Sequence, residues 1–314
     1  MKLAFFQGCN IPIRIEQYAV SAEAVLDKLG VQLEVVEEFT CCGYPVRNID
    51  EKAYIIPSVR NMAIAEKKGL DIMVICNCCF ASLQKAKTVM ANNPDLAAEI
   101  NELLAKDGLK YSGNTSIKHF LTVLHQDIGV DTIKKQLVKM VSELNLSVIH
   151  GCHILRPREV TMFDDSFVPK ITEELLAVTG AKSLDWRGKL ECCGAALSGL
   201  NNELSQTLLN EKVDTALQAG AHYITPICSY CHLQFDTTQP EIRNQETGKE
   251  LLPVLLLPQL LGLCLGIDER VLGLAQNTTI EPAHVENLKS LLGPPVEKKK
   301  RKKPRAKAKA QAAA

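Results

Sequence analysis

Ten of the twelve cysteines in this 314-residue chain repeat one pattern of five. Each copy has a lone cysteine, an adjacent pair followed by glycine, and a closing C-x-x-C. The first copy contains Cys9, Cys41, Cys42, Cys76 and Cys79. The second copy contains Cys152, Cys192, Cys193, Cys228 and Cys231. Thiolates are typical ligands of metal centres, so the internal repeat predicts two such centres, one in each half of the chain.

Other chemistry of clustered cysteines fits this pattern less well. Buried structural thiols would have no reason to recur in two matching frames. Disulfides are disfavoured because adjacent cysteines rarely bond to each other and the sequence contains no export signal. A structural zinc ion takes four ligands, whereas each copy offers five thiols, and this excess favours an iron–sulfur cluster. Zinc remains the alternative metal.

The formal charge of the chain is zero, with 36 basic and 36 acidic residues, but the basic residues are unevenly placed. Nine lysines and arginines lie between Lys298 and Lys309. Residues 294–314 are therefore expected to form a disordered basic tail, which leaves an acidic body. An acidic body argues against nucleic acid as a partner.

No apolar run reaches the roughly 18 residues expected of a membrane helix. The longest run, from Leu251 to Gly266, is interrupted by Pro253 and Pro258. The apolar stretch at the N-terminus is too short for a secretory signal and is typical of a buried strand. We therefore expect a cytoplasmic protein without a transmembrane segment, in a reducing compartment where clustered cysteines bind metal.

Apolar runs of strand length alternate with amphipathic helical patterns in both halves of the chain. This alternation predicts an α/β fold of two similar, duplicated lobes with parallel sheets and flanking helices. Strands are expected at residues 2–8, 31–39, 71–75, 146–150, 183–186 and 223–227. Helices are expected at residues 16–28, 51–68, 168–178 and 202–218. The predicted organisation is a first cysteine-rich domain at 1–93, a helical connection at 94–144, and a second cysteine-rich domain with C-terminal helices at 145–293.

Four of the cysteines directly follow predicted strands, namely Cys9, Cys76, Cys152 and Cys228. Open parallel sheets place their ligand sites at the carboxyl ends of strands, so both cluster sites are expected there. The C-x-x-C segments lie at helix starts, whose amide groups and dipole favour thiolates. A glycine after each pair, Gly43 and Gly194, allows the unusual backbone turn that two consecutive ligands require.

The spacing of both copies resembles that of the family with two cysteine-rich CCG domains, which includes the B subunit of heterodisulfide reductase. The resemblance covers about residues 2–265 and rests on the segments Phe6–Cys9, Gly151–His153, Cys192–Ala195 and Cys228–His232. It implies that each domain binds one non-cubane 4Fe–4S cluster through the five cysteines of its copy. Cys78 is an extra thiol that could replace Cys76 or Cys79 as a ligand. The C-x-x-C spacing of the second copy, however, favours Cys76 and Cys79 as the ligands.

By the same resemblance, the chain is expected to be the catalytic subunit of an oxidoreductase complex. It would reduce a small-molecule disulfide to two thiols in one-electron steps. The sequence has no G-x-G-x-x-G segment, no Walker-type loop and no ferredoxin-type run of four cysteines, so electrons must come from partners. A ferredoxin-like C subunit and a flavin-containing A subunit are the partners that the resemblance implies.

Two other functions compete with disulfide reduction. Within the same family, the chain could be an electron-relay subunit of a hydroxy-acid or glycerol-3-phosphate oxidation system, in which no disulfide is cleaved. A scaffold stabilised by zinc, with the basic tail as an interaction segment, is the third hypothesis. Metal analysis separates the third hypothesis from the first two.

Two histidines, His153 and His232, directly follow cysteines of the second copy, where the first copy has none. Because histidine transfers protons near neutral pH, we predict that both supply protons to the departing thiolates. Local packing or a hydrogen bond to cluster sulfur is the alternative role. Arg156 and Arg158 could bind an anionic group of the substrate or lie at the surface. Cys264, in an apolar helical segment, is expected to be a buried free thiol.

Overall fold

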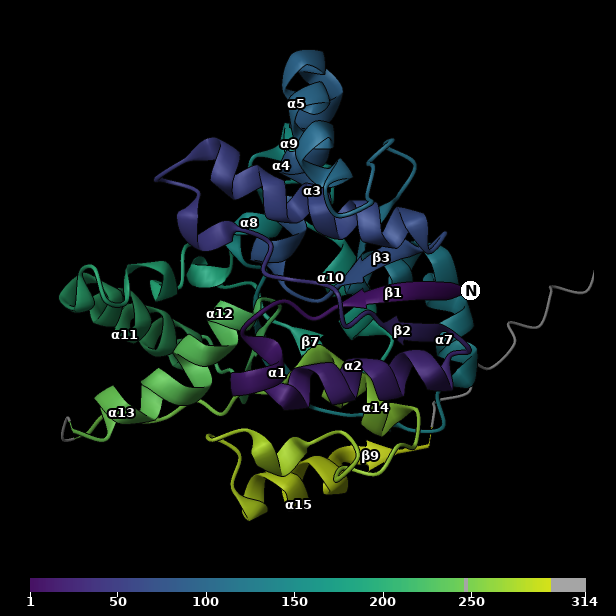
Figure 1. The fold of residues 1–314 in the computed structure, drawn as a ribbon. Helices are drawn as coiled ribbons and strands as arrows, with labels where there is room; N and C mark the ends of the chain where they lie inside the picture. Colours follow the sequence, from purple (N-terminus) through teal and green to yellow (C-terminus); the bar gives the residue numbers. More distant parts are fainter. Residues whose placement is uncertain (246–247, 295–314) are drawn as a thin grey trace, which may run out of the picture.

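The computed structural model describes residues 1–245 and 248–294 of the chain. This part of the chain forms two similar α/β lobes, each with a parallel sheet and helices packed around it (Figure 1). The fold class predicted from the sequence is confirmed. The predicted basic tail lies, apart from Pro294, outside the described residues. Within the described ranges, no helix is both long and apolar enough to cross a membrane.

The first lobe is built on a four-stranded sheet in the order β2, β1, β3, β4. Its strands are β1 (Lys2–Phe6), β2 (Gln32–Val35), β3 (Asp71–Val74) and β4 (Ile117–His119). All neighbouring strands run parallel, and Leu3 of β1 pairs with Leu33 on one side and Asp71 on the other. β1 carries a continuous apolar run because, as a central strand, it is buried on both faces. The carboxyl ends of β1 and β3 therefore lie side by side.

Helices surround this sheet. They are α1 (Ile11–Arg14), α2 (Glu16–Lys28), η1 (Tyr44–Val46), α3 (Glu51–Lys67), α4 (Asn77–Asn92) and α5 (Pro94–Ala105). The start of α3 is fixed by Asp50, whose carboxylate accepts a hydrogen bond of 2.8 Å from the Ala53 N–H. α4 packs against α3, and α5 projects from the top of the molecule in Figure 1. The C-x-x-C segment of the first copy lies at the start of α4.

The second lobe repeats this plan with a parallel sheet in the order β7, β6, β8. Its strands are β6 (Asn145–Ile149), β7 (Lys182–Ser183) and β8 (Tyr223–Pro226). A parallel bridge between Ile224 and Val254 takes the place of β4, since Ile72 pairs with Ile117 at the matching point of the first sheet. The helices are α8 (Cys152–Leu155), α9 (Arg158–Thr161), α10 (Ile171–Ala177), η3 (Arg187–Leu190), η4 (Ala195–Leu197), α11 (Asn202–Gln218), α12 (Ser229–His232), η5 (Leu233–Thr238) and α13 (Gln239–Arg243).

The segment between the lobes contributes β4 to the first sheet, whereas the sequence predicts a helical connection over residues 94–144. A strand of three residues is too short to show an alternating pattern in the sequence. After β4 come α6 (Phe120–Thr122), η2 (Val123–Gly129), α7 (Val130–Gln136) and β5 (Met140–Val141). After the second lobe come α14 (Leu257–Cys264), η6 (Leu274–Gln276), α15 (Pro282–Leu291) and β9 (Leu292–Gly293), which pairs with β5.

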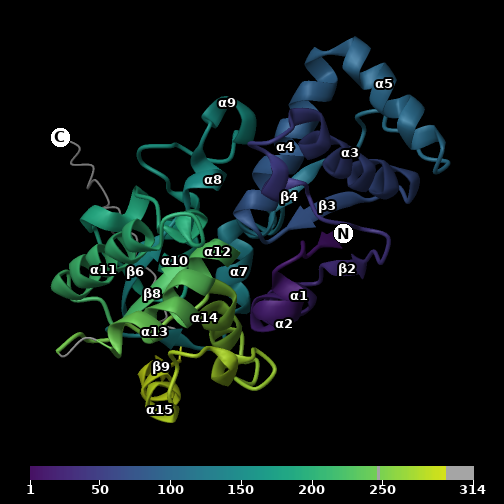
Figure 2. The same ribbon diagram turned by 60° about the vertical axis from the view of Figure 1, so that its left-hand side comes forward.

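Helices at the end of each lobe pack against the other lobe. α14, which follows the Val254 bridge of the second lobe, packs against α2 of the first lobe (Figure 2). In the reciprocal contact, α6 and η2, which follow β4 of the first lobe, pack against α10 of the second. α4 also packs against α8 and α9. A single buried apolar cluster therefore runs through both lobes.

Candidate metal centre

Two adjoining hollows lie where the strand ends of the two lobes face each other. The first hollow is lined by every cysteine of the first copy and by Cys78. The second is lined by every cysteine of the second copy and again by Cys78. Tyr44 and Tyr230 also line both hollows, so these three residues form a shared wall. The tertiary structure thus brings the ten predicted cysteines into two neighbouring groups of five.

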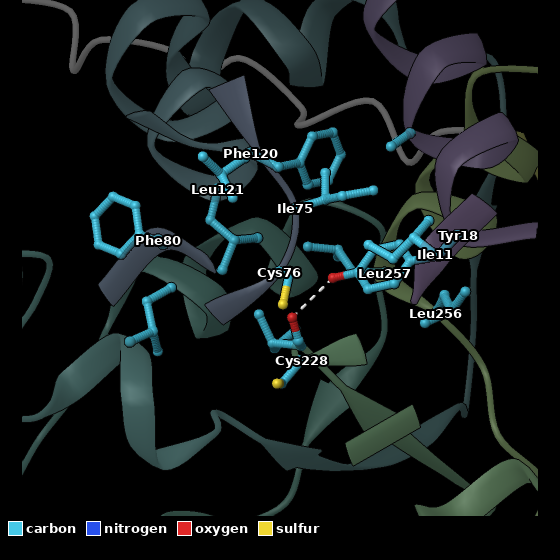
Figure 3. Packing of buried hydrophobic residues seen from close by; sticks show 14 of the residues in the cluster. Ile11, Tyr18, Ile75, Cys76, Phe80, Phe120, Leu121, Cys228, Leu256 and Leu257 are labelled. Carbon is cyan, nitrogen blue, oxygen red and sulfur yellow. Dashed lines mark hydrogen bonds between the residues drawn. The ribbon is translucent and has the colours of Figure 1, made fainter. Parts of the chain in front are cut away.

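Strand-to-helix turns place the cysteines at the centre of this arrangement. Cys76 is the N-cap residue of α4 and Cys228 is that of α12, and Cys79 and Cys231 follow within the first turn. Free amide groups at a helix start and the dipole of α4 favour the thiolate form. Cys76 and Cys228 face each other across the boundary between the lobes (Figure 3). Ser229 of the second lobe donates a hydrogen bond of 3.1 Å to the Cys76 sulfur.

Each cysteine pair is followed by a glycine in the left-handed conformation, with φ of 84° at Gly43 and 83° at Gly194. A Cβ atom at Gly43 would lie 2.2 Å from the carbonyl oxygen of Tyr54. At Gly194 it would lie 2.8 Å from the carbonyl oxygen of Ser205. Both the dihedral angle and the close approach of backbone therefore require glycine, as the sequence predicts.

The thiols lie close enough to hydrogen-bond to one another. Cys231 donates to Cys193 with a distance of 3.2 Å between the two sulfur atoms. Hydrogen bonds from Cys152 and Cys193 lower the pKa of Cys192 to about 2. Hydrogen bonds from its partner in the pair and from the lone cysteine of the first copy likewise lower the pKa of Cys41 to about 2. These hydrogen bonds therefore favour the thiolate, the form that binds metal, at one cysteine of each pair and the thiol at its partners.

This donor set fits an iron–sulfur centre. Each hollow offers five sulfur ligands from its own copy, whereas a structural zinc ion takes four ligands. Within residues 1–245 and 248–294, no three His, Cys, Asp or Glu side chains converge as ligands of a single metal ion. The five cysteines of each copy instead line one hollow, which is the donor set that a cluster of several irons needs.

Of the two predicted histidines, only His153 lines a hollow. Its ring lies in the second hollow, where Nδ1 is 3.3 Å from the Cys152 sulfur and 3.8 Å from the Cys78 sulfur. Its Nε2 shares a hydrogen bond of 2.9 Å with the Tyr44 hydroxyl of the first lobe. Burial, reinforced by the charge of Arg47, lowers the pKa of His153. His153 therefore connects the two lobes directly at the candidate site.

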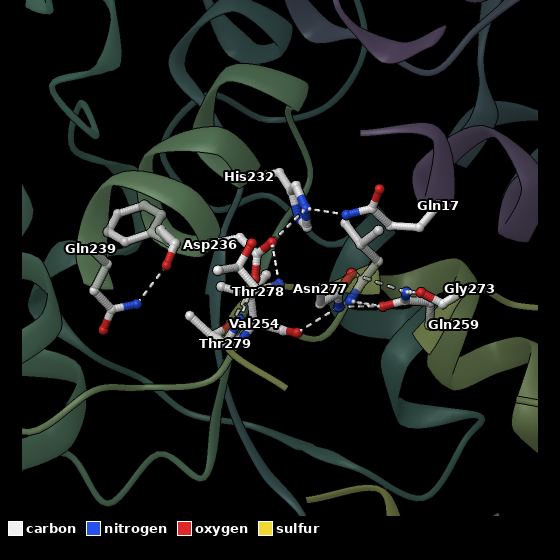
Figure 4. Close-up of polar contacts among 12 residues, drawn as sticks. Gln17, His232, Asp236, Gln239, Val254, Gln259, Gly273, Asn277, Thr278 and Thr279 are labelled. Carbon is white, nitrogen blue, oxygen red and sulfur yellow. Dashed lines mark hydrogen bonds and ion pairs between the residues drawn. The ribbon is translucent and has the colours of Figure 1, made fainter. Parts of the chain in front are cut away.

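His232 is fully buried and lines neither hollow. Its Nε2 lies 3.1 Å from the Gln17 amide nitrogen and 3.5 Å from an Asp236 carboxylate oxygen (Figure 4). Asp236 in turn accepts hydrogen bonds from the backbone N–H groups of Thr278 and Thr279. Since Gln17 lies on α2, this network ties the first lobe to the second and to the segment that follows α14.

The two tyrosines of the shared wall were not among the residues predicted to take part in the chemistry. Tyr44 and Tyr230 went unassigned, although both lie inside the cysteine motifs, and this position was the available signal. The Tyr44 ring also carries the Arg47 guanidinium over its face, at 3.8 Å from the ring centre. Cys78 and Tyr230 occupy the same place in the two C-x-x-C segments. The extra thiol of the first copy therefore corresponds to a tyrosine of the second, and both lie between the hollows.

The remaining candidates lie elsewhere. Arg156 and Arg158 are exposed and line neither hollow, and Arg156 donates a hydrogen bond of 3.2 Å to the Leu190 carbonyl. Cys264 is a fully buried free thiol, as predicted. The anion-binding role of the two arginines therefore has no support from the geometry of the hollows.

The duplicated sheets and the paired cysteine hollows define a class of two-lobed, cysteine-rich α/β proteins suited to iron–sulfur chemistry. The chain belongs to the CCG family of cysteine-rich domains, which matches residues 3–84 and 146–236. Each match contains one complete copy of the cysteine pattern. The two matches together span more than half of the chain.

Curated relatives resemble the chain over most of its length. A protein of Archaeoglobus profundus named as similar to the B subunit of heterodisulfide reductase is 33% identical over 87% of this chain and 94% of its own length. The B subunit of the ferredoxin/F(420)H(2)-dependent CoB-CoM heterodisulfide reductase of Methanosarcina acetivorans is 31% identical over 88% and 93%. The 8-methylmenaquinol:fumarate reductase membrane anchor subunit of Wolinella succinogenes is 31% identical over 88% and 96%. The expected resemblance to the B subunit of heterodisulfide reductase, part of an oxidoreductase complex, is confirmed.

A solved structure shares the fold. The crystal structure of a hypothetical protein from Helicobacter pylori superposes with a TM-score of 0.72 at 16% sequence identity. The match covers 90% of this chain and 52% of that chain, so this chain spans about half the length of the solved one. At this level of identity the likeness establishes the architecture alone.

Proposed function

We propose that this chain is the disulfide-reducing iron–sulfur subunit of a heterodisulfide reductase complex. The observation that carries the proposal is the wall shared by two five-cysteine hollows. Breaking one S–S bond takes two electrons and yields two thiolates. Two adjoining centres therefore suit one disulfide placed between them, because each centre can take one sulfur and supply one electron. The relatives from Archaeoglobus profundus and Methanosarcina acetivorans, whose names carry this activity, support it.

Each hollow would hold one non-cubane 4Fe–4S cluster through the five cysteines of its own copy. When bound, the two clusters supply the two electrons one at a time. We assign Cys76 and Cys79 rather than Cys78 as ligands in the first hollow. Two observations support this choice: Cys78 corresponds to Tyr230 in the second copy, and it lines both hollows rather than one.

Release of two thiols also takes protons, and we assign their delivery to His153. Its ring lies between the Tyr44 hydroxyl and the Cys152 sulfur, at 2.9 Å and 3.3 Å. Because burial lowers its pKa, the protonated ring gives its proton readily to a thiolate, and the neutral ring that remains takes up the second proton from solvent. The hydrogen bond between Nε2 and the Tyr44 hydroxyl holds the ring in place. The predicted donor role of His232 has less support, because that ring lies away from both hollows.

The partners follow from the need for electrons. We propose that a ferredoxin-like C subunit passes electrons to this chain from a flavin-containing A subunit. The name of the Methanosarcina acetivorans relative, one subunit of a ferredoxin/F(420)H(2)-dependent enzyme, supports a multi-subunit assembly. The substrate class is a small-molecule disulfide and not nucleic acid, and the location is cytoplasmic. Because the Wolinella succinogenes relative is named a membrane anchor subunit, cell fractionation is the test of that location.

An electron-relay subunit is the second candidate function. It is favoured by the same Wolinella succinogenes relative, whose name contains a fumarate reductase and no disulfide. In a relay, the two centres would pass single electrons onward without binding a thiol. The two functions therefore differ in whether substrate sulfur reaches the shared wall.

The first experiment measures iron, acid-labile sulfide and EPR spectra on protein prepared without air. We expect about eight irons and eight sulfides per chain, the content of two four-iron clusters. A new paramagnetic signal on adding thiol to the oxidised protein supports disulfide reduction. Full iron without a thiol response supports the relay. Zinc in place of iron would overturn both.

The second experiment compares His153→Gln with His232→Gln at equal iron content. We expect His153→Gln to lower disulfide turnover about 100-fold or more, the usual loss when a general acid is removed. His232→Gln should act mainly on stability, because its side chain joins α2 to α12. Unchanged turnover of His153→Gln between about pH 6 and 8 would contradict the proton-donor assignment.

A further inference from the structure

Helices α3 and α11 occupy equivalent places in the two lobes, so their residues can be compared one by one. The N-cap residues Asp50 and Asn201 both accept hydrogen bonds from the backbone three residues later, at 2.8 Å and 3.0 Å. Gly43 packs against the Tyr54 carbonyl and Gly194 against the Ser205 carbonyl. All these pairs are separated by 151 positions. At the same offset, the residue that matches Asn61 of α3 is Lys212 of α11.

In the first lobe this position is neutral. Asn61 is fully buried, and its amide group bonds only backbone and hydroxyl partners. It accepts a hydrogen bond of 2.9 Å from the Thr40 N–H and donates one of 3.0 Å to the Thr40 carbonyl. It also donates one of 3.4 Å to the Cys41 carbonyl. The amide therefore holds the backbone before the first cysteine pair and adds no charge.

In the second lobe the same position carries a buried amine. Lys212 is 2% exposed, its Nζ donates to the Gly188 carbonyl, and it lies 5.4 Å from the centre of the Trp186 ring. None of the ion pairs among the described residues includes Lys212. Burial lowers its pKa, while the nearby cysteines, Cys231 and Cys193 foremost, oppose that shift. The Lys212 amine is thus held by a carbonyl and an aromatic face of the second lobe, and the cysteines that act on its charge belong to the second copy.

The charge of Lys212 acts on one hollow more than on the other. Its electrostatic partners, besides Glu191, are cysteines of the second copy. Arg47 does not create the same asymmetry, because it stacks on Tyr44, which lines both hollows. A positive charge in a buried, low-dielectric site stabilises added negative charge strongly. Reduction adds negative charge to an iron–sulfur centre, and nearby charge is one of the factors that set its potential.

We infer that Lys212 makes the centre of the second lobe easier to reduce than that of the first. The inference rests on the proposed iron–sulfur function of both hollows. It assigns an order to the two centres: the first electron taken up by the chain rests in the second lobe, next to His153. The duplicated lobes are then electrostatically unequal, although their cysteine patterns match.

The test is a redox titration with dithionite as the electron donor, followed by EPR and visible absorbance, without any disulfide present. Unmodified protein should show two separate midpoint potentials. Lys212→Met should lower the higher potential and leave the lower one unchanged. We expect a change of at least tenfold in the one-electron equilibrium, which corresponds to 59 mV. Lys212→Arg, which keeps the charge, should retain two separate potentials.

Lys249→Met is the matched control, because Lys249 pairs with Asp214 of the same helix α11 at 2.9 Å and lies partly exposed. It should leave both potentials unchanged. Iron content checks that each variant keeps both clusters, and Lys212→Gln replaces Lys212→Met if that variant loses iron. A single shared potential in unmodified protein, or a shift of the lower potential, would overturn the inference. Correct potentials without turnover of any disulfide would instead contradict only the proposed reaction.

Discussion

Gly43 is the residue on which the first cysteine pair depends most directly. Its left-handed backbone turns the chain immediately after the pair, and the Tyr54 carbonyl lies where a Cβ atom would be, 2.2 Å away. Any side chain must therefore move backbone of α3, which also holds the first hollow together. Gly30 has a similar φ of 81° but no atom within 4 Å of its Cβ position. Comparing Gly43 with Gly30 therefore separates the cost of the left-handed dihedral angle from the cost of the close contact.

We predict that Gly43→Ala destabilises the protein by about 2 kcal/mol more than Gly30→Ala. The Gly30 variant carries only the left-handed backbone penalty, about 1–2 kcal/mol, whereas the Gly43 variant adds a clash with backbone. Denaturant unfolding measures the difference, and iron analysis should show a loss confined to the Gly43 variant. Equal losses in both variants would mean that the contact with Tyr54 is easily relieved.

His119 is a buried residue whose protonation should be visible in the pH dependence of stability. It is fully buried at the end of β4, between the rings of Phe80 and Phe163, each 5.7 Å away. Its Nδ1 accepts a hydrogen bond of 3.3 Å from the Leu121 N–H. Desolvation lowers the pKa of His119 to about 3. The folded protein therefore keeps this ring neutral where the unfolded chain would protonate it.

A depressed histidine pKa weakens the folded state as the pH falls below the unfolded value of about 6.5. We predict that this residue alone removes about 2 kcal/mol of unfolding free energy between about pH 7 and pH 5. His119→Asn keeps a hydrogen-bond acceptor but lacks the titration. The stability gap between the two proteins should therefore narrow by that amount on acidification, as measured by denaturant unfolding. A gap that stays constant would show that His119 titrates normally.

Among the secondary-structure elements, the helices that follow the cysteine pairs, α3 and α11, set the position of the cysteine pair in each hollow. α3 begins at Glu51 and α11 at Asn202, in both cases eight residues after the glycine of the motif, Gly43 or Gly194. The N-cap side chains, described above, bond the first turn of each helix. A cap satisfies an otherwise free amide group and fixes where the helix begins. The position of the helix start then decides where the backbone of each pair lies.

We predict that Asp50→Ala lowers the unfolding free energy by about 1 kcal/mol, the usual cost of losing an N-cap. Asp50→Asn keeps an acceptor oxygen and should lower the unfolding free energy by only about 0.3 kcal/mol, because the charge near the helix dipole is lost. Thermal unfolding of the two variants, at matched iron content, makes the comparison. If the Asn variant is as unstable as the Ala variant, the negative charge and not the hydrogen bond stabilises α3.

In the molecule as a whole, the two lobes are interlocked. In each lobe, the helix that follows the last strand or bridge of the sheet packs against the other lobe. α14 of the second lobe packs on α2, and α6 of the first lobe packs on α10. Hydrogen bonds cross the same boundary, including one of 2.8 Å from the Tyr18 hydroxyl to the Ile227 carbonyl (Figure 3). Another, of 2.9 Å, runs from the Asn77 amide to the His150 carbonyl. Neither lobe buries its apolar surface alone.

We predict that the protein unfolds in one cooperative transition despite its duplicated architecture. Separating the lobes would expose α2, α10 and the shared apolar core, which costs about 25 cal/mol for each Å² of apolar surface. Calorimetry and hydrogen exchange on the full chain make the measurement. Two resolved transitions, or protection that is lost in one lobe while the other stays protected, would contradict the interlocked description.

The amino-acid sequence alone was enough to predict the duplicated α/β class, the strands that carry apolar runs and the two matching sets of five cysteines. These features are local: strand and helix periods, the glycine after each pair and the C-x-x-C spacing are all written in neighbouring residues. It could not predict β4, because a three-residue strand shows no period. Nor could it separate His153 from His232, since both follow a cysteine in the same way.

The residues that meet across the lobes became known only from the tertiary structure. It placed Cys78, Tyr44 and Tyr230 on a wall shared by both hollows, with His153 beside them, and it buried His232 inside the second lobe. It also aligned the buried lysine of α11 with the buried asparagine of α3. Such contacts join segments far apart in the chain, and they depend on how whole helices pack, which no local pattern of residue types encodes.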